Sequence, residues 1–303
     1  MSGIISTALE LGLINAIAVL ALFLSYQMLN ICDLSTDGCF TFGASVGAVV
    51  ALQGHPYLSI PAAMLAGALS GITVSFLQWK MGIDSLLAGI IVNTALYSIN
   101  IAVMGNASLA NLNKTDTVFS LFKSLLKGSF LSSYYRIFVI LLFVIMVVLF
   151  LNWFLKTKLG LAIRATGSNR IMVASSSVDA DRMTMIALAV SGSMCALSGC
   201  LLAQYQKSSS IDIGSGILTI ALASLLIGRI FYRHDSPMLV KICCSVLGSF
   251  VFRIIYALSL RLNVPAFMLK LISSLIVALA ISFPYFCRRY QEKKQMRKEE
   301  ETC

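Results

Sequence analysis

The chain has 303 residues, of which 58% are hydrophobic and only 12% are charged. Soluble domains carry about a quarter of charged residues, so this composition excludes an ordinary soluble protein and predicts an integral membrane protein. The net charge of +10 does not indicate a nucleic-acid partner, because the basic residues lie at the ends of apolar runs and not on one polar face. We therefore expect no nucleic acid among its partners.

The cysteines and histidines do not indicate a metal or redox site. The eight cysteines lie mostly inside apolar segments and form no CxxC pair, which is typical of free, buried thiols. Neither His55 nor His234 has a second ligand at helical spacing, so we expect no metal and no other cofactor. The first apolar run is too long for a signal peptide and has no basic segment before it, which predicts a retained helix.

Apolar runs close to the length of a membrane-spanning helix recur along the sequence. They predict an all-α fold, a polytopic transmembrane helix bundle of about nine spans, with roughly eight to ten as the range. Residues 1–286 would form this membrane domain, and residues 287–303 a charged tail. The expected spans are 8–29, 39–52, 57–79, 85–104, 135–155, 183–204, 214–231, 238–258 and 267–286.

A short polar connector, residues 30–38, separates the first two spans. It begins at Asn30 and carries Asp33 and Asp37. A connector this short could lie at membrane depth, where a carboxylate is tolerated only inside protein or in a wet cavity. The alternative is a short interfacial loop, which hydropathy does not exclude.

The fourth span carries a polar face. Asn93, Tyr97 and Asn100 are spaced by four and three residues, which places them on one side of a helix. Two amides and a phenol in a span either join helices by hydrogen bonds or line a polar path; joining is favoured for any single residue, and a path for the set. Stripes of small residues predict close helix packing elsewhere: Gly43 and Gly47; Ala63, Gly67 and Gly71; Ser191, Cys195 and Gly199.

The basic segment 156–182 has the pattern of a docking surface. Residues 160–167 predict a short amphipathic helix that Gly167 ends in a left-handed turn. Ser168 is expected to cap a second short helix, and Asp179 a third that enters the membrane. An ordered loop without a partner is an alternative of about equal weight. Two arginines, Arg164 and Arg170, project from the segment, and its apolar residues are Leu161, Ile163, Ile171 and Val173.

Orientation follows from the distribution of Lys and Arg. With segment 156–182 inside, fifteen basic residues fall on the inner side, tail included, and six on the outer side. This bias predicts that the segment and the tail are cytoplasmic. With nine crossings the N-terminus lies outside, and a tenth crossing or a re-entrant piece near residues 30–52 would change that end only. In the outer connection 105–134, residues 118–126 could lie along the membrane surface. Arg253 and Lys270 lie within spans and should either find partners or snorkel to a membrane face, of which snorkelling is favoured.

Several stretches resemble one family of membrane proteins. TKLGLAIRATGSN (157–169), VDADRM (178–183) and LSGCLLAQYQ (197–206) are similar to permease subunits of ABC importers of the branched-chain amino acid and ribose type. LNICDLSTDG (29–38) and LAGIIVNTALYSINIAVMG (87–105) resemble the subgroup associated with tryptophan and tyrosine uptake. The resemblance spans most of the chain.

The resemblance implies a multi-pass permease in a bacterial cell membrane that moves a small solute inward by alternating access, with an aromatic amino acid as the expected solute. Its partners would be a second copy of the permease, a cytoplasmic ATP-binding-cassette ATPase and an extracytoplasmic substrate-binding protein. The chain would not be an enzyme, and it contains no GxxxxGK(S/T) phosphate loop. The implied ATPase-coupling residues are Arg164, Ala165, Thr166, Gly167, Ser168, Asn169 and Arg170, and the candidates for the translocation path are Asn30, Asp33, Asp37, Asn93, Tyr97 and Asn100.

Two alternatives remain open. One is an ion-coupled secondary transporter, which should show paired intramembrane acids and two related halves with interrupted helices; the sequence holds no second copy of connector 30–38. The other is a permease of the same class that carries a sugar or another small solute. The chain also departs from the family pattern, because Arg229 stands where many relatives carry glutamate and Met268 where many carry aspartate, which removes an obvious partner for Lys270.

Overall fold

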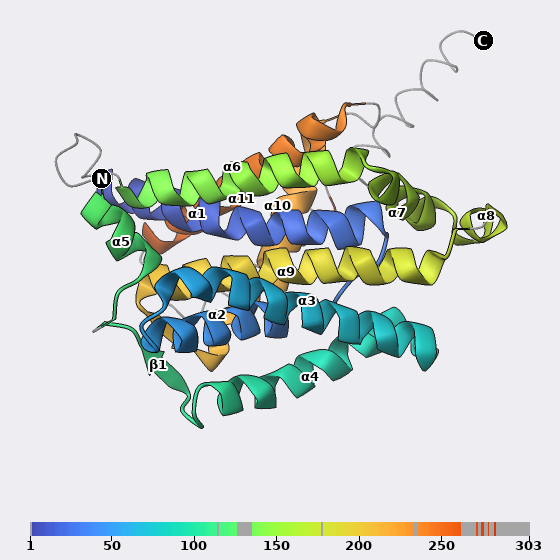
Figure 1. Cartoon of the computed structure of the whole chain (residues 1–303). Helices are drawn as coiled ribbons and strands as arrows, with labels where there is room; N and C mark the ends of the chain where they lie inside the picture. Colours follow the sequence, from blue (N-terminus) through green and yellow to red (C-terminus); the bar gives the residue numbers. More distant parts are fainter. Residues whose placement is uncertain are drawn as a thin grey trace, which may run out of the picture.

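The structure is a computed structural model of the chain (Figure 1). It describes residues 2–113, 115–125, 135–176, 178–232 and 236–261, and isolated helical positions after residue 270. Most of the expected last span (267–286), with Met268 and Lys270, and the charged tail (287–303) lie outside the described residues.

The described part of the chain is a bundle of α-helices, which confirms the expected polytopic all-α fold. Seven of its helical segments are long and apolar enough to cross a membrane, and one further apolar helix is shorter. The long segments are α1 (Ser2–Leu22) continued by the π-helix η1 (Phe23–Met28), α3 (Pro56–Lys80), α4 (Ser85–Val103), α6 (Tyr135–Lys156), α9 (Ala180–Gln206), α10 (Ile217–Ile230) preceded by the 3-10 helix η3 (Ile211–Gly214), and α11 (Met238–Arg261); the shorter helix is α2 (Thr36–Leu52).

Local sequence signals set several helix ends. Pro56 is the first residue of α3, where its missing N–H has no helical partner to lose. Asp84 caps α4, because its side chain accepts a hydrogen bond from the Leu86 N–H at 2.9 Å. Asp179 accepts from the N–H groups of Asp181 and Arg182 at the start of α9, which confirms the expected cap.

The two ends of the bundle carry different connections (Figure 1). α7 (Lys158–Ser168) and α8 (Arg170–Ser175) lie together at one end, beyond α6 and α9, which they connect. At the opposite end lie α5 (Val118–Leu125) and the strand β1 (Leu109–Asn111). β1 pairs in an antiparallel manner with β2 (Ser208–Ser210), a small sheet that the sequence did not predict. We call the end with α7 the inner end and the end with β1 the outer end, as the basic residues predict.

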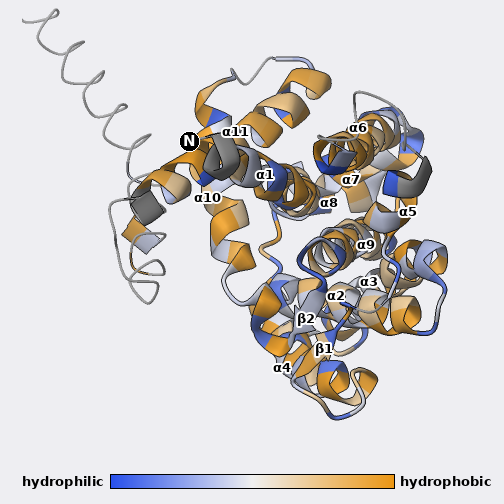
Figure 2. Cartoon of the chain, turned by 90° about the vertical axis from the view of Figure 1, so that its left-hand side faces the viewer, coloured by the Kyte–Doolittle hydropathy of each residue, from blue (hydrophilic) through white to orange (hydrophobic). Residues whose placement is uncertain are grey.

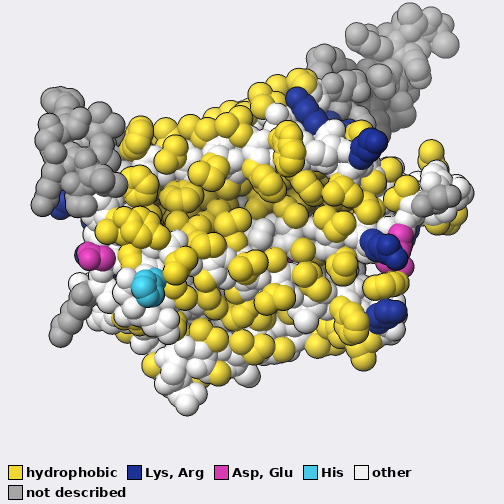
Figure 3. Space-filling view, viewed as in Figure 1, with side chains coloured by type: hydrophobic (Ala, Val, Ile, Leu, Met, Phe, Trp, Pro, Cys, Tyr) yellow, Lys and Arg dark blue, Asp and Glu magenta, His cyan; other side chains and the backbone are white. Residues whose placement is uncertain are grey.

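Apolar side chains cover the surface between these two ends. Figure 3 shows a broad hydrophobic band across the visible face, with the coloured charged side chains and the histidine near its two ends. In the end-on view of Figure 2, hydrophobic residues lie on the outward sides of the helices as well as between them. A band of this kind fits a protein whose middle is surrounded by lipid.

Small residues let α9 lie close to its neighbours at the centre of the bundle. A Cβ atom at Gly192 would lie 2.3 Å from the carbonyl oxygen of Gly67 in α3, and one at Gly199 would lie 2.0 Å from that of Phe40 in α2. On another side of α9, the Ser191 hydroxyl donates to the carbonyl oxygen of Ala21 in α1 at 2.8 Å. The expected stripes are confirmed in part: Gly67 and Gly199 lie at close backbone contacts, whereas Ser191 faces α1 and Gly192, outside the expected stripe, meets α3.

Arg253 of α11 has partners inside the bundle. The Asn15 amide of α1 faces its guanidinium, and with its oxygen turned that way it accepts from Nε at 3.0 Å. The Tyr256 ring centroid lies 5.7 Å from the guanidinium carbon. Arg253 thus joins α1 to α11, and the expectation that it snorkels is wrong, because a cation in a span is stabilised by polar partners close at hand.

Candidate functional site

α2 begins near the middle of the bundle and not at its inner end. The thiol of Cys195, near the centre of α9, donates to the Thr36 carbonyl oxygen at 3.4 Å. The thiol of Cys39 donates to the carbonyl oxygen of Gly192, also near that centre, at 3.3 Å. From this level α2 runs to the outer end, where Ala51 packs near β1. At about 1.5 Å per residue it covers roughly 25 Å, less than the ~30 Å core of a bilayer.

α10 begins at the same level and runs the other way. A Cβ atom at Gly214, just before α10, would lie 2.2 Å from the Asp37 carbonyl oxygen at the start of α2. Beyond the end of α10, the hydroxyl of Tyr232 accepts a hydrogen bond from Gln27 of η1, which belongs to the inner end. α10 itself covers roughly 21 Å, so α2 and α10 meet by their N-termini near the middle of the bundle. We call them half-helices because each runs from there to one end.

The Asp37 carboxylate links the two half-helices. Its Oδ1 accepts a hydrogen bond from the Leu218 N–H at 2.7 Å, and its Oδ2 accepts one from the Gly216 N–H at 3.0 Å. Gly216 has a φ of +87°, a left-handed conformation that suits glycine. The carboxylate therefore caps α10 from a different helix, in the place where a helix N-terminus attracts negative charge.

The polar face of α4 lies against the same point. The Asn93 side-chain oxygen accepts from the Gly38 N–H at 2.8 Å, and the Asn100 amide donates to the Gly38 carbonyl oxygen at 3.4 Å. A groove of about 260 Å³ lies between α2, α4 and η3. Its lining residues are Asp37, Gly38, Thr41, Asn93, Thr94, Tyr97, Asn100, Ile211, Asp212 and Ser215.

Four of the six residues expected on a translocation path line this groove: Asp37, Asn93, Tyr97 and Asn100. The other two lie elsewhere. Asp33 is 5% exposed, and its carboxylate accepts from the Ser35 N–H at 2.9 Å and from the Ser35 hydroxyl at 2.7 Å, so it stabilises the turn before α2. Asn30 lies just after η1 with a φ of +59° and is exposed. Its backbone conformation is that of a turn residue.

Sequence reasoning missed the contribution of the segment before α10. Asp212 and Ser215 line the groove, although Asp212 falls in the short connection between the expected spans 183–204 and 214–231, and Ser215 at the start of the second. The glycines Gly214 and Gly216 were a usable signal, because two glycines around one residue favour a tight turn or a close backbone approach. The position of that turn beside Asp37 depends on tertiary contacts.

We predict that the two aspartates of connector 30–38 differ in access to water. In a background without native cysteines, Asp37→Cys should react with a small water-soluble thiol reagent roughly ten times faster than Asp33→Cys, because reactivity follows exposure. Thr94→Cys is a second reporter of the groove that leaves the α10 cap intact. If Asp37→Cys and Thr94→Cys both react as slowly as Asp33→Cys, the groove is closed to water.

The inner end presents α7 and α8 as a second candidate site. Within α7, Ile163 is buried in the core while Leu161 is exposed, and within α8, Val173 is buried while Ile171 is exposed. Each helix therefore has one apolar residue that anchors it and another that faces outward. Exposed apolar residues on an anchored surface outside the membrane are typical of a protein–protein contact.

Two details of this surface differ from the sequence expectation. Gly167 lies within α7 and has no left-handed conformation; a Cβ atom there would lie 2.1 Å from the Met28 carbonyl oxygen at the end of η1. The glycine is thus required by close approach and does not end the helix. The cap of α8 is Asn169 and not Ser168, because its side-chain oxygen accepts from the N–H groups of Ile171 and Met172, each at 3.1 Å.

An ion pair ties α8 to the start of α9. Arg170 of α8 pairs with Asp181 of α9, whereas Arg182 pairs with Asp179 within the start of α9 at 2.9 Å. All four side chains are partly exposed, so each pair contributes little to stability, about 0–1 kcal/mol. Among the other residues expected for ATPase coupling, Thr166 is buried, and the exposed ones are Arg164, Ala165, Ser168 and Asn169.

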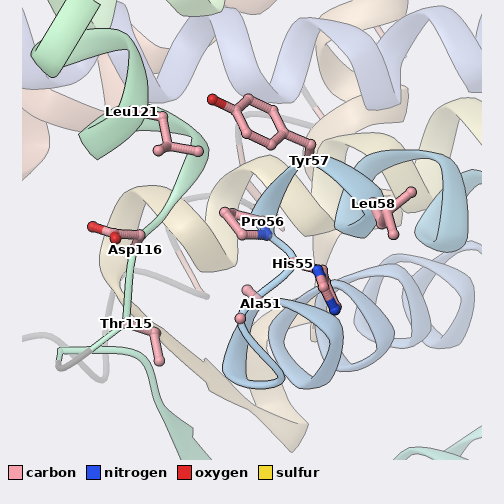
Figure 4. A pocket seen from close by; sticks show the side chains of 9 residues that line it. Ala51, His55, Pro56, Tyr57, Leu58, Thr115, Asp116 and Leu121 are labelled. Atoms are coloured by element: carbon pink, nitrogen blue, oxygen red, sulfur yellow. The ribbon is translucent and has the colours of Figure 1, made fainter.

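A larger hollow of about 430 Å³ opens at the outer end (Figure 4). The turn from α2 to α3 forms one side, with His55, Pro56 and Tyr57, and the connection into α5 forms the other, with Asp116 and Leu121. In Figure 4 the Tyr57 hydroxyl points toward the α5 side. Neither this hollow nor any other part of the described chain brings three His, Cys, Asp or Glu residues together as metal ligands.

The chain is similar to known membrane permeases over most of its length. The family model described as "Branched-chain amino acid transport system / permease component" matches residues 4–282. A tyrosine transport system permease protein of Clostridioides difficile (strain R20291) is 32% identical over 278 residues, covering 91% of this chain and 90% of that protein. An uncharacterized protein of Rickettsia prowazekii (strain Madrid E) is 31% identical over 284 residues, covering 92% and 97%. No solved structure matches.

The match covers nearly all of the helices described above, including α2, α4, α7 and α10. The helix bundle is what a multi-pass permease requires, and the family match extends over nearly all of it. The chain therefore belongs to the family of ABC-type permeases that form the membrane component of branched-chain amino acid transport systems.

Proposed function

We propose that the chain is the permease subunit of an ABC importer that carries an aromatic amino acid inward across a bacterial cell membrane. The observation that supports this most strongly is the polar groove near the middle of the bundle, where α2 and α10 meet. A solute path needs polar groups at this depth, and helix interruptions are tolerated there only where they are buried or line a wet cavity. Segment 156–182 and the tail would be cytoplasmic.

The groove also supports a homodimer. It opens on the side of the protomer, where Tyr97 is 54% exposed and Thr94 is exposed as well. Facing hydrocarbon, the neighbouring carboxylate of Asp37 would be costly, because charged groups inside a membrane need protein or water around them. A second copy that covers this side would enclose a water-filled path between the two protomers.

The docking surface on α7 and α8 suits a cytoplasmic ATPase. Gly167 of α7 lies directly on the Met28 and Leu29 backbone, and the chain from there leads through connector 30–38 to Asp37. A movement imposed on α7 would therefore reach the start of α2 through a short and tightly packed route.

At the outer end, the hollow beside Tyr57 and Asp116 could receive side chains of an extracytoplasmic binding protein.

The interrupted helices and the family match also bear on the two alternatives, a secondary transporter and a permease for sugars. Interrupted helices are shared with many secondary transporters, so they do not distinguish the two classes. Membership of the permease family favours the ABC class, and the relative named for tyrosine transport favours an amino acid over a sugar. The aromatic side chain of Tyr97 at the groove is compatible with a flat, amphiphilic solute.

The test is transport by the reconstituted assembly at saturating binding protein. Tyr97→Ala should lower the maximal uptake rate of labelled tyrosine about three- to tenfold with little change in the half-saturating concentration, because a residue on the path affects passage and not capture. Ile99→Ala, on the opposite side of α4, is the matched control and should transport normally. An unchanged rate for Tyr97→Ala would remove this face from the path. A preference of the whole transporter for sugars would exclude the aromatic substrate.

A further inference from the structure

The charged side chains of the groove are hydrogen-bond acceptors. Asp37 and Asp212 contribute carboxylates from two different elements, and no Lys, Arg or His is among the described residues that line it. The hydroxyl of Thr41 already donates to the Asp37 carbonyl oxygen at 3.0 Å, and that of Thr94 donates to the Ile91 carbonyl oxygen at 2.8 Å. What these hydroxyls still offer to a solute is therefore their lone pairs.

The side chain of Asn100 provides independent evidence that the groove receives a hydrogen-bond donor. Its side chain is 1% exposed and lines the groove, and its Oδ1 has no hydrogen-bond partner within the described part of the chain. The amide is held in place from its other side, since its nitrogen donates to the Gly38 carbonyl oxygen. Buried carbonyl oxygens nearly always have a partner, so this oxygen indicates a donor that is supplied from outside the chain.

Hydrogen bonds fix the orientation of the Asp37 carboxylate but do not use all of its lone pairs. Each of its carboxylate oxygens accepts one backbone N–H from the start of α10, at 2.7 and 3.0 Å. A carboxylate has about four lone-pair positions, so roughly two remain for another donor. Asp212, on η3, is exposed at the same groove.

We propose that the acceptors of Asp37, Asp212 and Asn100 form a subsite for a primary ammonium group, occupied by the α-ammonium of an amino acid on its way through the permease. This inference rests on the proposed function for the identity of the solute. An ammonium group carries one positive charge and three N–H donors, which matches two carboxylates and one unpaired amide oxygen. The described lining holds no Lys, Arg or His for the α-carboxylate of the solute, so the carboxylate would lie away from the two aspartates, and a neutral sugar would leave the charge of the groove uncompensated.

The test uses protection from thiol labelling in the full-length permease, so it needs neither ATPase nor binding protein. Thr94→Cys in a cysteine-free background, held in lipid nanodiscs, reports occupancy of the groove. Three probes separate the ends of the solute: tyrosine, tyramine, which lacks the carboxylate, and 3-(4-hydroxyphenyl)propionate, which lacks the ammonium. Tyrosine and tyramine should protect the thiol at concentrations at least about tenfold below those of the propionate, as expected for charge-assisted hydrogen bonds.

Two variants locate the effect. Asp212→Asn should abolish the advantage of tyramine over the propionate, and Asp116→Asn, which removes an exposed acid at the outer end, should preserve it. Equal protection by the propionate, or full tyramine protection in Asp212→Asn, would overturn the subsite. Protection by potassium or sodium chloride as strong as by tyramine would assign the acceptors to an inorganic cation and would also overturn it.

The outcome is separable from that of the proposed function. If tyramine protects the groove and the reconstituted wild-type assembly nevertheless fails to take up tyrosine, the ammonium subsite stands and the aromatic substrate is wrong. If tyrosine is taken up while tyramine gives no protection, the transport function stands and the ammonium subsite is wrong.

Discussion

Replacing Met172 with glutamate should separate the permease from the ATPase that we propose docks on α7 and α8. Met172 is 66% exposed and its neighbour Ile171 is 84% exposed, although both belong to a short helix anchored by the buried Val173. If a partner covers these side chains, a glutamate would be buried there without a counter-charge. Loss of a central contact of this kind weakens a protein complex by about 2 kcal/mol or more. Co-purification of the ATPase, and with it transport, should fall to background.

The matched control is Met81→Glu. Met81 is 63% exposed in the turn between α3 and α4, so the same substitution adds the same charge at the inner end away from α8. This variant should retain the ATPase, and both variants should insert and elute as folded protein from a sizing column. Normal ATPase recovery with Met172→Glu would show that α8 is not part of the contact.

Replacing Gly167 with valine should uncouple ATP hydrolysis from transport. A Cβ atom at this position would lie 2.1 Å from the Met28 carbonyl oxygen and 2.9 Å from the Leu29 backbone, so α7 must move away from the end of η1. Overpacking of this kind costs about 1–3 kcal/mol and shifts the backbone. The docking residues stay on α7 and α8, so ATP hydrolysis should continue while uptake is lost.

Two variants in the same helix separate the clash from a general weakening of α7. Leu159 is 44% exposed on α7 and lies outside residues 164–170, so Leu159→Val places the same β-branched side chain on the helix away from the coupling residues and should preserve transport. Gly167→Ala should be intermediate, because it adds the clashing Cβ atom alone. The measurement is the ratio of solute carried to ATP hydrolysed in proteoliposomes. A normal ratio for Gly167→Val would contradict the proposed route from α7 to connector 30–38.

Features that depend on neighbours in sequence were predictable. Hydropathy predicted the long spans, because a bilayer stabilises an apolar helix of sufficient length whichever helices it later packs against. The polar face of α4 followed from the spacing of Asn93, Tyr97 and Asn100, and the cap of α9 followed from Asp179 alone. The distribution of basic residues predicted that α7 lies at the opposite end from α5, and the arrangement of the helices agrees with it.

Local chemistry was ambiguous where two residues could perform the same task. Ser168 and Asn169 are both good helix caps, and the backbone of Asn169 is the one that adopts the extended conformation a cap needs. Gly167 was consistent with a left-handed helix end and also with a close approach, and the position of η1 selects the second. Neither choice can be made from the segment without its neighbours.

Features that depend on distant contacts required the three-dimensional arrangement. The depth at which α2 and α10 begin does not follow from hydropathy, because averaging over a span-length window removes an interruption within it. Asp37 reaches the N–H groups of Gly216 and Leu218, far along the chain, and Asp33, four residues before it, is buried in its own turn instead. Periodicity and composition describe one helix at a time, whereas the groove exists only where three elements pack together and leave the Asn100 oxygen without a donor from the described residues.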